Sequence, residues 1–300
     1  MIDVLIEKIK ERNNPTVAGL DPKLDYVPEE MKAAAFREHG ETFAGAAAAI
    51  LQFNKTLIDA LCDIVPAVKP QSAYYEMYGI EGIRCLHETI AYAKKNGMYV
   101  ILDAKRGDIG ATSEAYAKAY LGKTELGGVT EEAFGADCLT VNPYLGTDGI
   151  KPFTDQCAAN QKGIFVLVKT SNKSSGELQD LKSEGKYIYE HMAELVKTWG
   201  SDLIGVNGYS SVGAVVGATY PEQAEALRSQ MPHTYFLVPG YGAQGGKAED
   251  VAKSFNKDGL GAIVNASRSI MCAYQKQGGT LGDAARAEAI RMRDDILSAL

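Results

Sequence analysis

The chain has 300 residues, a hydrophobic fraction of 46% and a formal net charge of −7. This length allows one large domain with a full core, and the acidic balance argues against nucleic acid as a partner. No apolar run approaches the ~20 residues of a membrane helix, and the N-terminus lacks the apolar stretch of a secretory signal. The five cysteines form no C-x-x-C pair, which argues against a structural zinc. We therefore expect a cytoplasmic protein without a membrane partner, with a single domain over residues 1–300.

Eight short apolar runs alternate with longer helical patterns along the chain. The expected strands are Thr16–Leu20, Ile64–Lys69, Tyr99–Ala104, Cys138–Asn142, Ile164–Lys169, Ala214–Ala218, Tyr235–Pro239 and Ala262–Asn265. Near-continuous apolar strands, each followed by a helix, are typical of a parallel sheet covered on its faces. Eight such units predict a closed (β/α)8 TIM barrel, with a doubly wound open sheet as the alternative. For the sixth strand, Asp202–Val206 is a second candidate.

The expected helices fill the intervals between these strands and the end of the chain. They are Ala44–Cys62, Ile80–Lys95, Ser113–Leu121, Thr147–Gln161, Tyr187–Thr198, Pro221–Gln230, Ala248–Asn256 and Thr280–Leu300. Two further segments, 22–40 and 172–185, exceed what a barrel needs and are expected to be polar loop insertions. They follow the first and fifth strands, so both would lie at the mouth of the barrel, where long loops either cover a site or merely extend the surface.

Charged residues crowd the end of the third expected strand. Asp103, Lys105 and Asp108 lie within six residues, and strand alternation places the first two on one face. Buried charges are expensive unless they are paired, so a structural ion-pair cluster is the alternative to a catalytic array. The carboxyl ends of barrel strands share one rim, where active sites lie. Other polar residues at expected strand ends are Asp21, Lys69, Lys169–Asn172, Gln244 and Arg268.

The last two expected strands are followed by segments suited to a phosphate group. Residues 240–246 are rich in glycine, and 265–269 contain Arg268. Loops at these positions often bind phosphate in this fold, through backbone N–H groups and helix N-termini. Gly240, Gly242 and Gly245 match the dinucleotide pattern G-x-G-x-x-G, but the pattern comes late in the chain and lacks the acidic residue expected about 20 positions later. We therefore reject a dinucleotide site.

From about Thr16 to Ser269 the chain resembles the orotidine 5'-phosphate decarboxylase family in its longer bacterial form. The motifs that carry the resemblance are Asp103–Ile109, Gly19–Pro22, Val68–Pro70, Thr140–Tyr144, Lys169–Asn172, Gly217–Pro221 and Pro239–Gly246. The resemblance implies a (β/α)8 barrel that works as a homodimer with shared active sites and without a metal or organic cofactor. The implied reaction is decarboxylation of orotidine 5'-phosphate to UMP and CO2.

The resemblance also implies roles for residues of the charged array. Lys105 would protonate C6 of the pyrimidine, and Asp103 would lie beside the departing carboxylate. Lys69 would complete the array and contact the ribose, while Asp21 would bind a ribose hydroxyl. The residues that would hold the phosphate are Gln244 and Arg268.

Other implied roles concern the partner subunit and the base. Asp108, Ile109 and Thr112 would reach into the neighbouring subunit's site, where Asp108 joins the array. Ser171 would hydrogen-bond the base, with Thr170 as the alternative because the loop after the fifth strand is long.

Two competing functions remain open. A magnesium-dependent sugar-phosphate decarboxylase or aldolase of the same suprafamily also carries Asp-x-Lys-x-x-Asp, but it would need a further acidic ligand, for which Asp137 and Glu76 are the candidates. A non-enzymatic barrel that binds a nucleotide phosphate would explain the glycine-rich segment but not the charged array.

Overall fold

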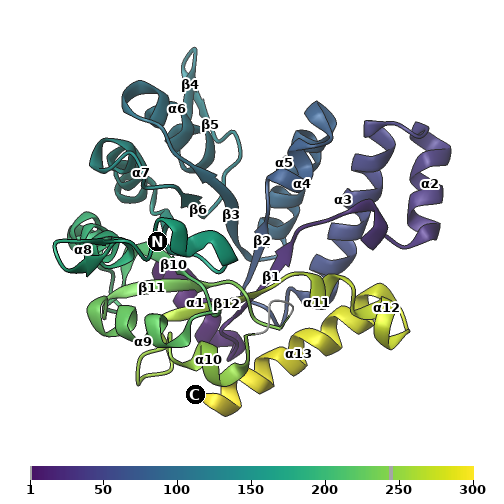
Figure 1. The fold of residues 1–300 in the computed structure, drawn as a ribbon. Coiled ribbons are helices and arrows are strands. Elements are labelled where there is room, and N and C mark those ends of the chain that lie inside the picture. The colour runs from purple at the N-terminus through teal and green to yellow at the C-terminus, as the bar shows by residue number, and fades with distance from the viewer. Residues whose placement is uncertain (1, 243–245) are drawn as a thin grey trace.

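A computed structural model describes residues 2–242 and 246–300 of the chain. The main sheet consists of β1 (Thr16–Leu20), β2 (Ala67–Pro70), β3 (Tyr99–Arg106), β6 (Cys138–Val141), β7 (Gly163–Lys169), β10 (Ser210–Val216), β11 (Thr234–Val238) and β12 (Ala262–Ala266). These strands pair in the order β1-β12-β11-β10-β7-β6-β3-β2 and close into a barrel. All eight pairings are parallel, so the predicted (β/α)8 TIM barrel is confirmed (Figure 1).

The apolar runs that predicted the strands are buried on both faces. Every residue of β1, β2, β6 and β11 is buried, as expected for parallel strands between a filled interior and a layer of helices. The sixth barrel strand, β10, starts at Ser210, four residues before the predicted start. The competing candidate Asp202–Val206 is not a strand, because Ser201–Leu203 forms a 3-10 helix.

Helices surround the barrel and one closes its base. The helices of eight or more residues outside segment 22–40 are α1 (Ile2–Arg12), α3 (Phe43–Leu61), α5 (Gly79–Lys95), α6 (Gly110–Leu121), α7 (Thr147–Asn160), α8 (Ile188–Gly200), α9 (Pro221–Gln230) and α13 (Leu281–Ala299). The shorter ones are α4 (Ala73–Glu76), α10 (Ala248–Ala252), α11 (Arg268–Met271) and α12 (Ala273–Gln277). Leu5 and Ile9 of α1 belong to one buried apolar cluster with Tyr99 and Tyr235 from the strands. The α1 helix therefore covers the end of the barrel opposite the predicted site. No helix in the described residues is long and apolar enough to cross a membrane.

Segment 22–40, expected to be a loop, is largely helical. It contains the 3-10 helix η1 (Leu24–Tyr26) and the α-helix α2 (Glu29–His39), which packs beside α3 (Figure 1). The start and stop signals are in the sequence: Glu29 and Glu30 suit the positive end of a helix dipole, and Gly40 ends the helix at φ +72°. The loop prediction was wrong because α2 buries no residue and therefore shows no strong apolar stripe.

Segment 172–185, also expected to be a loop, holds only short elements. It holds the short 3-10 helix η2 (Lys173–Glu177) and the first strand of a hairpin made by β8 (Lys182–Ser183) and β9 (Lys186–Tyr187). Both η2 and this hairpin lie between β7 and α8, in the connection that leaves the carboxyl end of β7.

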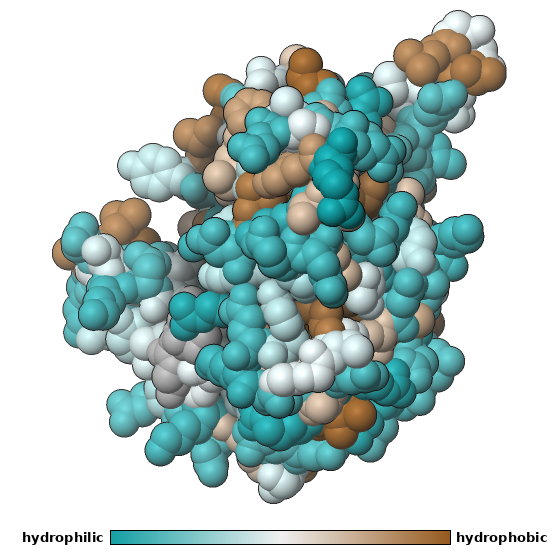
Figure 2. Space-filling model, turned by 90° about the vertical axis from the view of Figure 1, so that its right-hand side faces the viewer, coloured by the Kyte–Doolittle hydropathy of each residue, from teal (hydrophilic) through white to brown (hydrophobic). Residues whose placement is uncertain are grey.

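A second hairpin, which we did not predict, joins α6 to β6. It consists of β4 (Thr124–Leu126) and β5 (Val129–Glu131) and projects at the top of Figure 1. Its residues are exposed, including Leu126 at 52% and Val129 at 58%. The molecular face drawn in Figure 2 is otherwise mainly hydrophilic, with hydrophobic side chains scattered over it, as expected for a chain that is 23% charged.

Candidate active site

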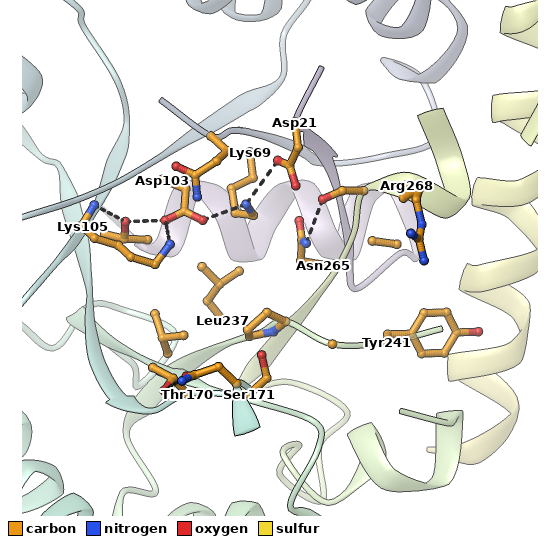
Figure 3. A pocket seen from close by; sticks show the side chains of 18 of the residues that line it. Asp21, Lys69, Asp103, Lys105, Thr170, Ser171, Leu237, Tyr241, Asn265 and Arg268 are labelled. Atoms are coloured by element: carbon orange, nitrogen blue, oxygen red, sulfur yellow. Dashed lines mark hydrogen bonds and ion pairs between the residues drawn. The ribbon is translucent and has the colours of Figure 1, made fainter. Parts of the chain in front are cut away.

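The carboxyl ends of the barrel strands surround a cavity of about 760 Å³. This volume lies in the range of small-molecule sites. The cavity gathers side chains from elements that are far apart in the chain (Figure 3). The predicted site residues that line it are Asp21, Lys69, Asp103, Lys105, Ser171 and Arg268.

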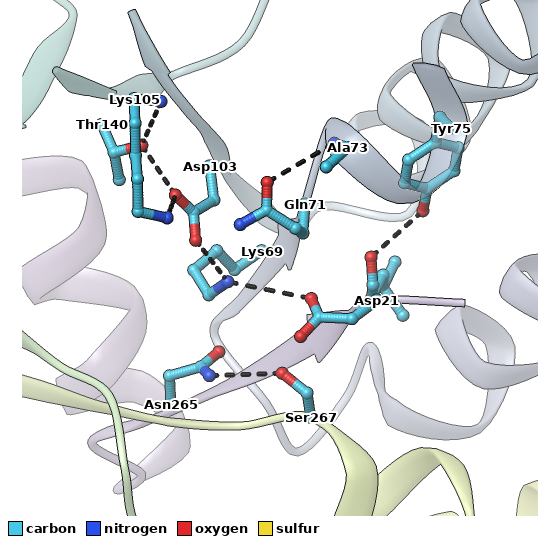
Figure 4. A network of polar contacts seen from close by, with 11 residues as sticks. Asp21, Lys69, Gln71, Ala73, Tyr75, Asp103, Lys105, Thr140, Asn265 and Ser267 are labelled. Atoms are coloured by element: carbon cyan, nitrogen blue, oxygen red, sulfur yellow. Dashed lines mark hydrogen bonds and ion pairs between the residues drawn. The ribbon is translucent and has the colours of Figure 1, made fainter. Parts of the chain in front are cut away.

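Asp103 is the centre of the charged array (Figure 4). Its Oδ2 accepts a hydrogen bond from Lys69 Nζ at 2.9 Å, and its Oδ1 accepts one from Lys105 Nζ at 2.6 Å. Thr140 on β6 adds a hydroxyl hydrogen bond of 2.8 Å to the same Oδ1. The Asp103 side chain is 10% exposed and that of Lys69 is 5% exposed, whereas that of Lys105 is 45% exposed. The array therefore holds one buried and one accessible ammonium on a single buried carboxylate.

The meeting of Asp103 and Lys105 does not come from simple strand alternation. Lys105 has φ +49°, in the left-handed region that non-glycine residues rarely adopt. The β3–β6 register shifts between Leu102 and Arg106, and the Lys105 N–H donates to Thr140 Oγ1 at 2.9 Å. A bulge therefore sets the direction of the Lys105 side chain, and backbone strain of this kind is common at functional sites.

The electrostatics of the array favour its ionised form. Burial alone would raise the pKa of Asp103, but the charges of Lys69 and Lys105 outweigh it and hold that pKa well below its usual range. Burial alone would lower the pKa of Lys69, but the carboxylates of Asp103 and Asp21 outweigh it and raise that pKa. Asp103 and Lys69 therefore stay charged at neutral pH inside the cavity.

The depressed pKa of Asp103 predicts how stability depends on acid. A carboxyl whose pKa is lower in the folded state stabilises the fold above its unfolded pKa, and this contribution is lost as the pH falls below that value. We expect the free energy of unfolding of the wild type to fall more steeply than that of Asp103→Asn between about pH 5 and about pH 3. Urea unfolding followed by circular dichroism at a series of pH values measures this, and parallel curves for the two proteins would contradict it.

Asp21 lies next to the array at the end of β1. Its Oδ1 is 3.9 Å from Lys69 Nζ, is buried, and has no hydrogen-bond partner among residues 2–242 and 246–300. A buried acceptor without a partner is costly in a folded protein unless a ligand or water completes it. This carboxylate is thus suited to accept a hydroxyl hydrogen bond from a ligand.

The cavity is also lined by residues that the sequence prediction did not assign to the site. Among them are Gln71, Thr140 and Asn265. Thr140 orients Asp103, as described above, and Asn265 donates from Nδ2 to Ser267 Oγ at 3.3 Å. Gln71 directly follows the Val68–Pro70 motif, and its Oε1 accepts a hydrogen bond from the Ala73 N–H. Gln71 and Asn265 could have been found in the sequence, because both lie at the carboxyl ends of predicted strands.

Ser171 and Thr170 at the end of β7 differ in the polar groups they leave free. The Thr170 N–H donates to Gln179 Oε1 at 2.9 Å, and its hydroxyl accepts from Gln179 Nε2 and donates to Asn172 Oδ1. In the described part of the chain, neither the N–H nor the hydroxyl of Ser171 has a hydrogen-bond partner. Of the two residues, Ser171 therefore offers the free donor and acceptor to the cavity.

Asp108, Ile109 and Thr112 do not line the cavity of their own subunit. Asp108 accepts a hydrogen bond from the Ile109 N–H at 2.8 Å, and the Ile109 side chain is 54% exposed. Thr112 is exposed on the first turn of α6. Ile109 and Thr112 are thus exposed beside the rim, whereas Asp108 is half-buried.

On the opposite side of the cavity, Arg268 is exposed and forms no ion pair with any described residue. Its guanidinium can therefore bind an anion. A short helix, α11, begins at Arg268, where the sequence led us to expect a helix N-terminus beside the phosphate. Gln244, the other predicted phosphate ligand, falls outside the residues that the structure describes.

The two candidates for the further acidic ligand of the magnesium-dependent alternative are engaged elsewhere. Glu76 pairs with Arg106, and Asp137 accepts a hydrogen bond from the Val100 N–H at 2.9 Å. Neither lines the cavity, and the described residues contain no group of three or more His, Cys, Asp or Glu that could hold a metal ion.

The fold and the site define a class of protein. A closed parallel barrel, with a Lys–Asp–Lys array and a free arginine around one cavity at its carboxyl rim, is the arrangement of a (β/α)8-barrel enzyme for a small anionic substrate.

The comparisons with known proteins identify the family within this class. Residues 49–278 match the model of the orotidine 5'-phosphate decarboxylase / HUMPS family, and the chain belongs to this family. Orotidine 5'-phosphate decarboxylase of Rhodopirellula baltica is 45% identical over 288 residues, which cover 94% of this chain and 93% of that protein. The Clostridium perfringens SM101 enzyme of the same name is 42% identical, with coverage of 99% and 98%. The structure of Leishmania donovani OMP decarboxylase has a TM-score of 0.76 at 32% identity and covers 99% of this chain and 98% of its own.

Proposed function

We propose that this chain decarboxylates orotidine 5'-phosphate to UMP and CO2, a step of pyrimidine synthesis. The single observation that carries this proposal is the Lys69–Asp103–Lys105 array inside the barrel cavity, in a chain of this family. A structural ion-pair cluster would bury all its charges, whereas the Lys105 side chain is 45% exposed and lines the cavity. A barrel that only binds a nucleotide would have no use for an accessible ammonium held on a buried carboxylate.

The chemistry requires a cation and a proton at one carbon atom. When the bond between C6 and the carboxylate breaks, its electron pair stays on C6, and CO2 leaves. The Lys105 ammonium is placed to stabilise this negative charge and then to transfer a proton to C6, which leaves Lys105 as a neutral amine. Asp103 and Thr140 hold Lys105 in place, because both bind it directly, through its side chain and its backbone N–H.

The remaining parts of the nucleotide have matching groups around the cavity. The free N–H and hydroxyl of Ser171 fit the O4 acceptor and N3–H donor of the pyrimidine edge. Asp21, with its unpartnered buried Oδ1, fits a ribose hydroxyl beside Lys69. Arg268 and Gln244 would hold the phosphate, whose binding energy can stabilise the closed, active geometry.

The active enzyme is a homodimer in this proposal, with sites shared between subunits. The supporting observation is that Asp108, Ile109 and Thr112 do not line their own cavity, and that Ile109 and Thr112 are exposed. Among these residues, Ile109 is a large apolar side chain that is 54% exposed. A carboxylate next to the exposed apolar side chain of Ile109 suits a contact in which Asp108 enters the neighbouring cavity. The five cysteines are free, which favours a reducing compartment such as the cytoplasm.

The function is tested by one assay that also tests the absence of a metal requirement. We expect the purified protein to convert orotidine 5'-phosphate to UMP, followed by ultraviolet absorbance, at the same rate with and without excess EDTA. A rate that EDTA abolishes and Mg²⁺ restores would support the magnesium-dependent alternative. Binding of UMP without turnover of orotidine 5'-phosphate would support the non-enzymatic barrel.

A further inference from the structure

Lys169 is a buried lysine that the proposed chemistry does not use. It is the last residue of β7, its side chain is 1% exposed, and it does not line the cavity. Its Nζ donates to Asp180 Oδ1 at 2.7 Å and to Ser175 Oγ at 3.1 Å. The same ammonium lies 4.8 Å from the centre of the Tyr220 ring. Because a buried ammonium is expensive even when paired, this cluster calls for a role beyond packing.

The cluster fixes the segment that runs along the cavity after β7. Asp180 and Ser175 both belong to this segment, so their bonds to Lys169 tie it back to the end of the strand. Gln179, adjacent to Asp180, lines the cavity and makes two hydrogen bonds to Thr170. Its Oε1 accepts from the Thr170 N–H at 2.9 Å, and its Nε2 donates to the Thr170 hydroxyl at 2.8 Å. The Gln179 carbonyl in turn accepts from the N–H of Tyr189 at the start of α8.

Ser171 is confined from the other side by β10. The N–H of Gly217, directly after β10, donates to the Lys169 carbonyl at 2.8 Å. A Cβ at Gly217 would lie 2.8 Å from the Ser171 Cβ, so the two backbones approach as closely as glycine allows. Ser171 is thus held between Gly217 on one side and Thr170, which Gln179 binds, on the other. Its free N–H and hydroxyl therefore have a fixed position.

We propose that Gln179 and the Lys169–Asp180 ion pair are positioning residues for recognition of the pyrimidine base. They act through Thr170 and Ser171 and have no part in the proton transfer. This inference rests on the proposed function, because Ser171 is the group that meets the base. It assigns specificity to a segment that is otherwise an insertion between β7 and α8.

The test compares a ligand that has the base with one that lacks it. Inhibition constants of UMP and of ribose 5-phosphate against orotidine 5'-phosphate turnover are measured for the wild type and for Gln179→Leu. We expect Gln179→Leu to raise the inhibition constant of UMP by roughly five- to tenfold. The inhibition constant of ribose 5-phosphate should stay within about twofold of the wild-type value. Gln230→Leu is the matched control, because Gln230 also bridges two groups, the Glu190 carbonyl and the Glu194 carboxylate, but does so between α9 and α8, away from the cavity.

Asp180→Asn provides a second variant that keeps the size of the side chain. The asparagine oxygen can still accept from Lys169 Nζ, which also keeps its bond to Ser175, so we expect this variant to fold and thermal unfolding to verify it. We expect this variant to weaken the binding of UMP selectively as well. If both variants bound UMP and ribose 5-phosphate equally more weakly, or if UMP affinity were unchanged in both, the inference would be overturned. The proposed function would still stand in that case, provided that the wild type turns over orotidine 5'-phosphate. A wild type that does not turn over orotidine 5'-phosphate would overturn both.

Discussion

Replacement of Lys105 by alanine is expected to lower kcat by more than about a thousandfold, because it removes both the cation and the proton donor at C6. The protein should still fold, since the Lys105 side chain is 45% exposed and Asp103 keeps its bond to Lys69. It should also still bind UMP through the groups for ribose, base and phosphate. Steady-state kinetics, calorimetric titration with UMP and thermal unfolding measure these three expectations.

The matched control is Lys151→Ala. Lys151 is likewise bonded to a carboxylate, that of Asp155 at 2.7 Å, but it lies on the exposed surface of α7. We expect this variant to keep full activity. If Lys105→Ala kept a tenth of the wild-type kcat, a difference of only about 1.4 kcal/mol in the barrier, Lys105 would not be the proton donor.

The barrel could be predicted because its strands are short, continuous apolar runs that are buried on both faces. The β7 and β11 strands match the prediction to within one residue at each end. Two surface elements were missed for the opposite reason: α2 buries no residue, and the hairpin of β4 and β5 is exposed throughout. Elements that contribute little to the core leave a weak hydrophobic pattern in the sequence.

The sequence indicated which strand ends carry polar residues at the cavity, but not how these residues are held in place. Asp103 and Lys105 do meet, but the bulge at Lys105, with its positive φ, could not be read from residue alternation. Thr140 lies 37 residues after Asp103, and the pairing of β3 with β6 brings its hydroxyl to the Asp103 carboxylate. Similarly, the choice between Thr170 and Ser171 depends on Gln179, whose fold-back after η2 no local pattern predicts.

Mixing two inactive variants should restore activity if the sites are shared between subunits. In a dimer of one Lys105→Ala and one Asp108→Asn subunit, one site combines both substitutions, and the other combines an intact Lys105 with an intact Asp108. Random exchange of subunits makes half of the dimers mixed, so we expect about a quarter of wild-type activity. Subunits are exchanged by mild denaturation and refolding of an equimolar mixture, and kcat is measured per total subunit.

The control mixture combines Lys105→Ala with Asp103→Asn. Lys105 Nζ and Asp103 Oδ1 are 2.6 Å apart within one subunit, so a mixed dimer of these variants contains no site with both residues intact. We therefore expect no recovery from this pair, whereas recovery in the first mixture would place Asp108 in the partner's cavity. Equal activity in the two mixtures would show that Asp108 acts within its own subunit, because only a shared site gives an intact site in the first mixture and none in the second. Full activity of Asp108→Asn on its own would show that Asp108 plays no part in the reaction.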